Sequence, residues 1–322
     1  MSKNTLGIDI SKKKFDVALL QGGKLKHKSF NNNQMGFEAL LGWLQRHNAL
    51  DAHICMEATG IYGESVAHFL HEAGIQLSVV NPARVKGFAQ SELVRTKTDK
   101  ADAGLIARFC AAMNPESWVP QPKHVRELRD LVRRLEALLD MRQQERNRLE
   151  AAPGVISEQL NEHIEYLEKA IKETKRLINE HIDNNSDMRD NKRLLETIPG
   201  IGEATIHVIL SEFADINRFK SAKALAAYLG VAPKLRQSGT SLRGRGMMSK
   251  MGRSALRKSF FMPALVALRY NPQLIEMKQR LLAAGKPKMA IVGAAMRKLV
   301  HIIYGVLKRR EPFNPNLIAQ KG

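Results

Sequence analysis

Four acidic residues stand where carboxylates can support metal-dependent chemistry. Asp9 interrupts a short apolar run, and Glu57 directly follows another. A carboxylate buried among apolar side chains is costly unless a cation or hydrogen-bond donors lie nearby. Asp99 and Asp102 stand three residues apart, so at the start of a helix both side chains can point to one side. Together they form a candidate set of four acids.

Divalent cations would neutralise these carboxylates if the chain brings them together. Two Mg²⁺ ions about 3.5 to 4 Å apart would balance the charge and activate attack on a phosphate. Two of the acids also have simpler interpretations. Asp99 is placed to cap a helix, and Asp102 to pair with Arg108 or Lys97.

The segments around the acids alternate between strand and helix patterns. Three apolar runs with a turn at Gly22-Gly23 predict three antiparallel strands, and alternating helices and strands follow. The strands are predicted at 5–10, 15–20, 25–30, 53–56 and 76–80, and the helices around 37–44, 66–71 and 99–113. This order is that of ribonuclease-H-like folds, in which the first and fourth strands are neighbours. A following helix would then carry its acids over their ends.

Prolines at 115, 120 and 122 mark a linker, after which the pattern becomes helical. Apolar residues from 128 to 141 and from 160 to 178 repeat at helical spacing, the second set as a heptad seam. Pro153-Gly154 separates the two helices, whose hairpin serves either self-association or an intramolecular pair. The polar stretch 183–191 closes this segment. We predict three domains: 1–122 (α/β), 123–190 (coiled-coil hairpin) and 191–322 (mostly helical).

The positive charge is concentrated in the last third of the chain. The whole chain has 51 Lys and Arg against 32 Asp and Glu, a net charge of +19. Residues 201–322 hold 22 of the basic residues and 5 of the acidic ones, a net charge of +17. Helices are predicted there at 221–229 and 289–307. Such a distribution indicates a polyanionic partner.

The sequence Pro199-Gly200-Ile201-Gly202 follows one apolar helix pattern and precedes another. This is the pattern of a helix-hairpin-helix, whose glycine turn exposes backbone N–H groups to a DNA phosphate. We therefore take Gly200 and Gly202 as candidate DNA contacts. A tight turn between two core helices is the alternative.

A glycine-rich basic segment, residues 237–246, contains serines that a phosphodiester could approach. Its glycines make the backbone pliant, and arginines can hold phosphates with two hydrogen bonds. Taken alone, Ser238 is an ordinary loop or capping residue, because no His or Asp partner is adjacent in sequence. The candidate phosphate-binding residues of this segment are Arg243, Arg245, Lys250 and Arg253.

Cys55 and Cys110 cannot form a disulfide framework, and we expect both to be buried apolar residues. The chain shows neither an apolar run of about 18 residues nor a signal peptide's apolar stretch. We therefore expect a cytoplasmic protein without a membrane partner.

Several of these motifs occur together, in the same order, in a known family. The chain resembles the DEDD transposases of bacterial insertion sequences, the RNA-guided bridge recombinases, over nearly its whole length. The motifs that carry the resemblance are Gly7-Ile8-Asp9-Ile10-Ser11, Met56-Glu57-Ala58-Thr59-Gly60, Asn81-Pro82, Lys97-Thr98-Asp99-Lys100-Ala101-Asp102, Ile198-Pro199-Gly200-Ile201-Gly202 and Ser238-Gly239-Thr240-Ser241.

The resemblance implies a RuvC-like first domain in which Asp9, Glu57, Asp99 and Asp102 bind Mg²⁺. It also implies a serine nucleophile in the C-terminal domain, placed by motif position on Ser238 with Ser241 as the alternative. A transient phosphoserine link to DNA would follow. The implied partners are donor and target DNA, a structured bridge RNA, and further copies of the chain in a dimer or tetramer. The carboxylate site of one subunit can then meet the serine of another.

Three other functions compete with this interpretation. The Gly7–Ser11 motif also resembles the first phosphate loop of actin-like and sugar-kinase ATPases, but their second glycine-rich phosphate loop is replaced here by a basic helix-hairpin-helix region. A nucleic-acid-binding protein without catalysis would not need four convergent acids. A junction-resolving nuclease would use the acids but form no covalent link to DNA.

Overall fold

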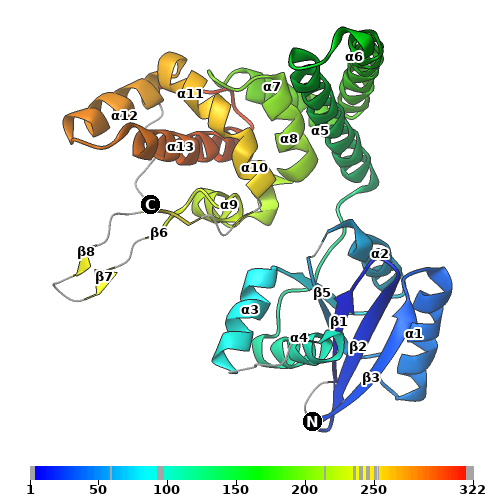
Figure 1. Ribbon diagram of the computed structural model, residues 1–322. Coiled ribbons are helices and arrows are strands. Elements are labelled where there is room, and N and C mark those ends of the chain that lie inside the picture. The colour runs from blue at the N-terminus through cyan, green and yellow to red at the C-terminus, as the bar shows by residue number, and fades with distance from the viewer. Residues whose placement is uncertain are drawn as a thin grey trace. The chain divides into compact units, whose positions relative to one another are not determined.

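The protein is seen in a computed structural model that describes residues 4–58, 60–92, 98–213, 215–234, 237–238, 242–243, 247–249, 252 and 254–316 (Figure 1). The chain divides into two compact units, Met1–Pro120 and Gln121–Gly322. The helical hairpin and the C-terminal helices belong to the same unit and share one hydrophobic core.

A five-stranded mixed sheet forms the centre of the first unit, in the order β3-β2-β1-β4-β5. Strand β2 is antiparallel to both of its neighbours, β1 and β3, whereas β4 and β5 run parallel to β1. Gly22 and Gly23 have positive φ values of 56° and 78° and form the turn between β2 and β3. The prediction that the first and fourth strands are adjacent is confirmed. The strands are β1 (Thr5–Ile10), β2 (Lys14–Gln21), β3 (Lys24–Asn31), β4 (His53–Glu57) and β5 (Leu77–Val80).

Helices cover both faces of this sheet (Figure 1). On one face, α1 (Gln34–Arg46) and α2 (Glu64–Glu72), which follows the short η1 (Ile61–Gly63), enclose the main core. On the other face lie α3 (Pro82–Ser91) and α4 (Asp99–Met113). The sequence pattern predicted α1, α2 and α4 but not α3. Only Val85 of α3 is buried, so this helix has no clear apolar stripe to reveal it.

Side chains of β1 alternate between the two faces, as a strand requires. Leu6 and Ile8 are fully buried in the core beneath α1 and α2. Thr5 faces α4, because its hydroxyl donates a 3.0 Å hydrogen bond to the carbonyl of Ala107. Gly7 faces α4 as well, and a Cβ there would lie 2.1 Å from the carbonyl oxygen of Ala103. Glycine is therefore needed for α4 to pack directly on β1.

The expectation that both cysteines are buried is confirmed. Cys55 of β4 and Cys110 of α4 lie in the small core between the sheet and α4. The Cys110 thiol donates a 3.4 Å hydrogen bond to the carbonyl of His53.

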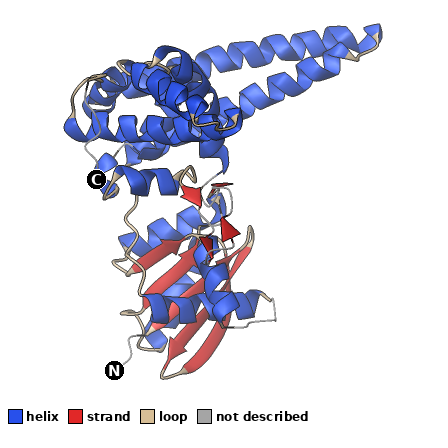
Figure 2. Cartoon of the chain, turned by 90° about the vertical axis from the view of Figure 1, so that its left-hand side faces the viewer, coloured by secondary structure: helices blue, strands red, loops and turns tan. Residues whose placement is uncertain are grey.

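A long helical hairpin begins the second unit and extends from its other helices (Figure 2). Its members are α5 (Lys123–Glu150) and α6 (Gly154–Asp183). The seam positions Leu167, Ile171 and Ile178 are buried, and they share the core with residues of α5. An ion pair of 2.7 Å joins Arg146 to Glu168 across the hairpin. The heptad seam is thus used for an intramolecular helix pair, the second of the two alternatives.

Several of the remaining helices, α7, α9, α11 and α12, pack against the last one, α13 (Lys288–Arg309), whereas α8 packs against α5 and α7. Helix α7 begins at Ser186, inside the polar stretch that was predicted to close the hairpin. Asn185 caps it by accepting a 3.1 Å hydrogen bond from the Met188 amide, and Met188 is buried. The hairpin therefore ends at Asp183, at the start of the polar stretch, and the next helix begins within that stretch. The elements are α7 (Ser186–Glu196), α8 (Glu203–Phe213), η2 (Ile216–Arg218), α9 (Ala222–Tyr228), α10 (Ser254–Ser259), α11 (Phe261–Tyr270), α12 (Pro272–Ala283) and α13 (Lys288–Arg309).

Among the described residues, four strands of two residues each interrupt this helical region, and the sequence pattern did not predict them. β6 pairs with β9, and β7 pairs with β8, all antiparallel. They are β6 (Pro233–Lys234), β7 (Gln237–Ser238), β8 (Leu242–Arg243) and β9 (Met247–Met248).

Helix α13 is long and apolar enough, by length and composition, to cross a membrane. The prediction concerned an unbroken apolar run, and Arg297 and Lys298 interrupt this one. Its apolar residues, such as Ile291, Leu299 and Ile303, are buried in the core of the second unit, as the helix of a packed domain requires.

Candidate functional site

Asp9 and a second aspartate are directly paired on two neighbouring strands of the sheet. Asp9 lies two residues beyond Gly7, so its side chain is on the α4 face of β1. In the β1–β2 register, Asp9 is paired with Asp16, and in the β2–β3 register Asp16 is paired with Ser29. Directly paired residues point to the same face of a sheet. Three polar side chains therefore form a row across β1, β2 and β3.

Glu57 extends this row on the other side of Asp9. The parallel register pairs Ile8 with Met56, so the next residues, Asp9 and Glu57, follow each other across the two strands at their C-terminal ends. Glu57 also lies two residues beyond Cys55, which faces α4. We call Glu57, Asp9, Asp16 and Ser29 the polar row.

Helix α4 brings the other two predicted acids towards this row. Its N-cap is Thr98, whose hydroxyl accepts a 3.2 Å hydrogen bond from the Ala101 amide. The alternative in which Asp99 caps the helix is therefore wrong. Asp99 and Asp102 lie in the first turn, and the close packing of α4 on Gly7 sets that turn beside the end of β1.

The ionised carboxylates act on one another in this site. Burial, followed by the charges of Asp102, Asp99 and Asp16 in that order, raises the pKa of Asp9 from 3.8 to about 6. A raised carboxyl pKa means that the charged form is held at a cost. The structure thus brings Asp9, Asp99 and Asp102 into one electrostatic cluster. Of the basic partners considered for Asp102, Arg108 lies 3.9 Å from Glu92, and Lys97 is outside the described residues.

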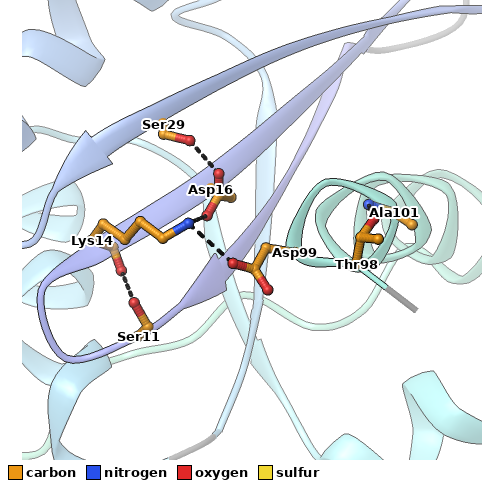
Figure 3. A network of polar contacts seen from close by, with 7 residues as sticks. All are labelled: Ser11, Lys14, Asp16, Ser29, Thr98, Asp99 and Ala101. Atoms are coloured by element: carbon orange, nitrogen blue, oxygen red, sulfur yellow. Dashed lines mark hydrogen bonds and ion pairs between the residues drawn. The ribbon is translucent and has the colours of Figure 1, made fainter.

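Two residues of β2 belong to this site although the sequence did not single them out (Figure 3). Lys14 Nζ lies 3.0 Å from Asp16 Oδ2 and 3.0 Å from Asp99 Oδ2. The Ser29 hydroxyl donates a hydrogen bond to the other oxygen of Asp16. The hydrogen bonds to Asp16 and Asp99 raise the pKa of Lys14, so its ammonium is held in the charged form. A basic and an acidic residue two apart on one strand was the signal available in the sequence.

The donor set of this site suits a hard divalent cation. Carboxylate oxygens are the preferred ligands of Mg²⁺, and a cation would relieve the repulsion that raises the pKa of Asp9. Among the described residues, however, no three acidic, histidine or cysteine side chains are grouped closely enough to hold a metal ion. Asp99, for its part, is bound to Lys14.

The two glycines of the predicted helix-hairpin-helix have different surroundings. The turn joins α7 to α8, and Gly200 adopts a φ of +100°. A Cβ on Gly200 would lie 2.6 Å from the Cβ of Ala267 in α11. The buried Asn271 side chain donates a 3.3 Å hydrogen bond to the Pro199 carbonyl. This part of the turn therefore serves core packing, whereas Gly202 is exposed, with open space around it.

The serine segment is described only in part. Ser238 lies in β7, where its backbone is paired with Leu242 of β8, next to Arg243. The other candidate residues of this segment, Ser241, Arg245, Lys250 and Arg253, lie outside the described residues.

Comparisons with known proteins add what the geometry leaves open. Residues 6–152 match the profile of a transposase family, and residues 192–279 match that of the IS116/IS110/IS902 family of transposases. The pilin gene-inverting protein of Moraxella bovis is 36% identical over 98% of this chain and 99% of its own length. The chain belongs to the IS116/IS110/IS902 transposase family. It is therefore a transposase or recombinase, and its substrate is DNA.

Other relatives agree with this assignment. The pilin gene-inverting protein of Moraxella lacunata is also 36% identical over 98% of this chain and 99% of its own length. An uncharacterised 43.6 kDa protein of insertion element IS110 from Streptomyces coelicolor is 26% identical over 43% of this chain and 34% of its own. The first region matched to the transposases contains all four predicted acids, and the second contains Gly200, Gly202 and Ser238.

A cationic group of the transposase lies mostly beyond the second matched region, and no motif in the sequence marked it. Burial, and then the charge of Arg280, lower the pKa of Lys298. Burial, and then the charges of Arg297, Lys298 and Lys223, lower the pKa of His301. We call these five residues, from α9, α12 and α13, the cationic face. Its sequence signal is three basic or titratable residues within five positions of an otherwise apolar helix.

Proposed function

We propose that this transposase cuts and rejoins DNA with a carboxylate site on the first unit and a serine nucleophile on the second. The observation that supports the first part most directly is the raised pKa of Asp9, which reflects burial together with the charges of Asp102 and Asp99. The strand order and the position of α4 also support a ribonuclease-H-like, RuvC-like first unit.

In this proposal Asp9, Glu57, Asp99 and Asp102 would hold Mg²⁺, which when bound would withdraw charge from the nonbridging oxygens of the phosphate under attack. The protein contributes the positions of the donors. The pairing of Ile8 with Met56 supports a position of Asp9 next to Glu57 at the strand ends. The Thr98 cap at the start of α4 supports the grouping of Asp99 and Asp102 in the first helical turn. Their separation of three residues directs both carboxylates to one side.

Ser238 is the proposed nucleophile of a pair of balanced transesterifications. In the first, a bond forms between Ser238 Oγ and the scissile phosphorus, and the bond from phosphorus to one DNA strand end breaks. The serine gives up a proton and the departing DNA hydroxyl gains one. In the second, a hydroxyl of the exchanged strand attacks the same phosphorus, and Ser238 leaves with its proton restored. Phosphodiester bonds are conserved throughout, so no nucleotide triphosphate is needed.

The partners of this reaction are also part of the proposal. The resemblance to bridge recombinases supports a bridge RNA that pairs with donor and target DNA, and a dimer or tetramer of the chain. The relatives from Moraxella are named as pilin gene-inverting proteins, which supports inversion of a DNA segment as one outcome of the strand exchange. Gly202 and the cationic face are the described features that fit nucleic-acid phosphates.

Capture of the covalent intermediate tests the serine role. The full chain is incubated with Mg²⁺, its flanking noncoding RNA and suicide substrates that carry the element ends, and the adduct is located by mass spectrometry. We expect a phosphoserine adduct at Ser238 that disappears in Ser238→Ala and persists in Ser241→Ala. The reverse pattern would move the role to Ser241. DNA cleavage without any adduct would indicate a junction-resolving nuclease instead.

Copurification tests RNA guidance independently. The transposase is purified from cells that carry its flanking DNA, and the bound RNA is sequenced. We expect one specific noncoding species encoded beside the gene. Random RNA fragments, together with recombination that proceeds after ribonuclease treatment, would contradict guidance and leave the chemistry of strand exchange in place.

A further inference from the structure

Lys14 connects strand β2 to the first turn of α4. It is the first residue of β2, and its ammonium lies 3.0 Å from an oxygen of Asp16 and 3.0 Å from an oxygen of Asp99 (Figure 3). One lysine thus bridges an acid of the sheet and an acid of the helix.

The two carboxylates that share Lys14 differ in how firmly they are held. The Asp16 side chain is 7% exposed, accepts a hydrogen bond from Ser29 and is paired with Asp9 across the strands. The Asp99 side chain is 60% exposed and stands on the first turn of a helix. Asp16 is therefore the fixed partner of Lys14, and Asp99 is the partner that can turn away with a small side-chain rotation.

We infer that Lys14 is a positioning residue that serves as the resident cation of Asp99 and releases this carboxylate when a divalent metal binds, while Asp16 retains the ammonium. The inference rests on the proposed function, because Asp99 is one of the proposed Mg²⁺ ligands. It adds two residues to the site: Lys14, which holds Asp99 while the metal is absent, and Asp16, which keeps Lys14 in place.

The charges determine whether Lys14 strengthens or weakens metal binding. An ammonium beside the site reduces repulsion among the carboxylates when the metal is absent. The same ammonium competes for Asp99 and repels an incoming divalent cation, because like charges separated by several ångströms oppose each other even in a partly solvated site. Lys14 therefore stabilises the metal-free arrangement and weakens metal binding. Removing its charge should tighten metal binding.

The test measures Mn²⁺ binding to the full chain in the absence of DNA, by the loss of the free-ion signal in electron paramagnetic resonance. Lys14→Met keeps the length and apolar stem of the side chain but removes the charge. Lys14→Arg keeps the charge. Lys13→Met is the matched control, because it removes the same charge from the exposed position directly before β2. The Mn²⁺ binding that is lost in Asp9→Asn is the binding that takes place at the carboxylate site.

We expect Lys14→Met to bind Mn²⁺ about three- to tenfold more tightly than the wild type, the range of a close pair in a partly solvated site. Lys14→Arg and Lys13→Met should remain within about twofold of the wild type, since the first keeps the pair and the second lacks it. Equal or weaker binding by Lys14→Met, with Asp9-dependent binding intact in the wild type, overturns this inference alone. The proposed metal site is overturned as well if neither the wild type nor Lys14→Met binds Mn²⁺, or if Asp9→Asn leaves the binding unchanged in both backgrounds.

Discussion

The polar row of the first unit and the cationic face of the second carry opposite charges but share one physical property. In the first, burial and neighbouring acids raise the pKa of Asp9. In the second, burial and neighbouring cations lower the pKa values of Lys298 and His301. Both shifts disfavour the charged form of the group. A cation would relieve the first region and a phosphate the second, which is the pairing that the proposed metal-dependent mechanism needs.

The two regions are also built differently. The acids are fixed by strand register and by a helix packed against a glycine, so their positions follow from the backbone of the first unit. Four of the five residues of the cationic face are long Lys and Arg side chains, and they come from three helices, α9, α12 and α13. Long cationic side chains adapt to a phosphate backbone, whereas metal ligands must be placed accurately.

The largest effect that would separate the two regions is expected from Asp9→Asn. The change keeps the shape of the side chain and removes a proposed metal ligand, so recombination of a plasmid substrate should fall by more than about a hundredfold, the upper range for disturbing a metal site. Affinity for DNA, measured by gel shift in the presence of EDTA, should stay within about twofold, because the cationic face is unchanged. Retained strand exchange would contradict the carboxylate mechanism.

Glycine substitutions test the packing of each unit separately. Gly7→Ala would place a Cβ 2.1 Å from a backbone oxygen of α4, and Gly200→Ala would meet Ala267 at 2.6 Å with a φ of +100°. Each should reduce the free energy of unfolding by about 1 to 3 kcal/mol, as overpacking typically does. Gly87→Ala is the control, because a Cβ there has open space and alanine favours the helix.

Calorimetry measures these variants, and limited proteolysis shows which unit is affected. We expect Gly7→Ala to expose cleavage sites in the first unit and Gly200→Ala to expose them in the second, while Gly87→Ala stays at or above the wild-type stability. If Gly7→Ala were as stable as the wild type, the close contact between β1 and α4 would be refuted.

Charge removal on the cationic face should have a smaller, additive effect. Arg297→Gln and Lys298→Gln should each weaken DNA binding several-fold and reduce the slope of log affinity against log salt by about one unit if each contacts one phosphate. Lys172→Gln, an exposed position on α6, removes the same charge elsewhere in the second unit. Fluorescence anisotropy across a salt series measures all three. Equal effects of the three variants would show that the cationic face has no special role.

The smallest expected effect is the pH dependence of the metal-free protein. The pKa of Asp9 is raised from 3.8 to about 6 in the folded state, so the folded protein holds this proton more tightly than the unfolded chain. The stability that this proton provides is complete below pH 3.8 and is lost as the pH rises through about 6. In thermal melts with EDTA, Asp9→Asn should therefore become more stable relative to the wild type over this range. An unchanged difference would contradict the shift.

Much of the first unit could be predicted from the sequence because its strands alternate clearly and its turns contain glycine. Asp16 could not be identified in that way. Its importance depends on the register that places it opposite Asp9 and on the reach of Lys14 to Asp99, and an alternation pattern contains neither. Helix α3 escaped prediction because it buries Val85 alone, so no periodic stripe marks it.

The second unit was harder to predict for two other reasons. The start of α7 lies in a polar sequence whose buried members include Met188 and Asn191, and only tertiary packing shows that they belong to a helix. The strands β6 to β9 have two residues each, which is too short for any repeating pattern. The role of Gly200 also depends on Ala267, a residue of another helix that the turn motif itself does not indicate.

The two buried cysteines allow opening of the first unit to be measured by thiol labelling. The hydrogen bond with Cys110 and burial raise the pKa of the Cys55 thiol above its ordinary range, so the closed protein offers almost no thiolate to an alkylating reagent. Modification must then await moments when α4 lifts from the sheet. The rate of thiol labelling therefore reports how often α4, the helix that carries Asp99 and Asp102, separates from the sheet. An ion bound between α4 and β1 would slow the labelling.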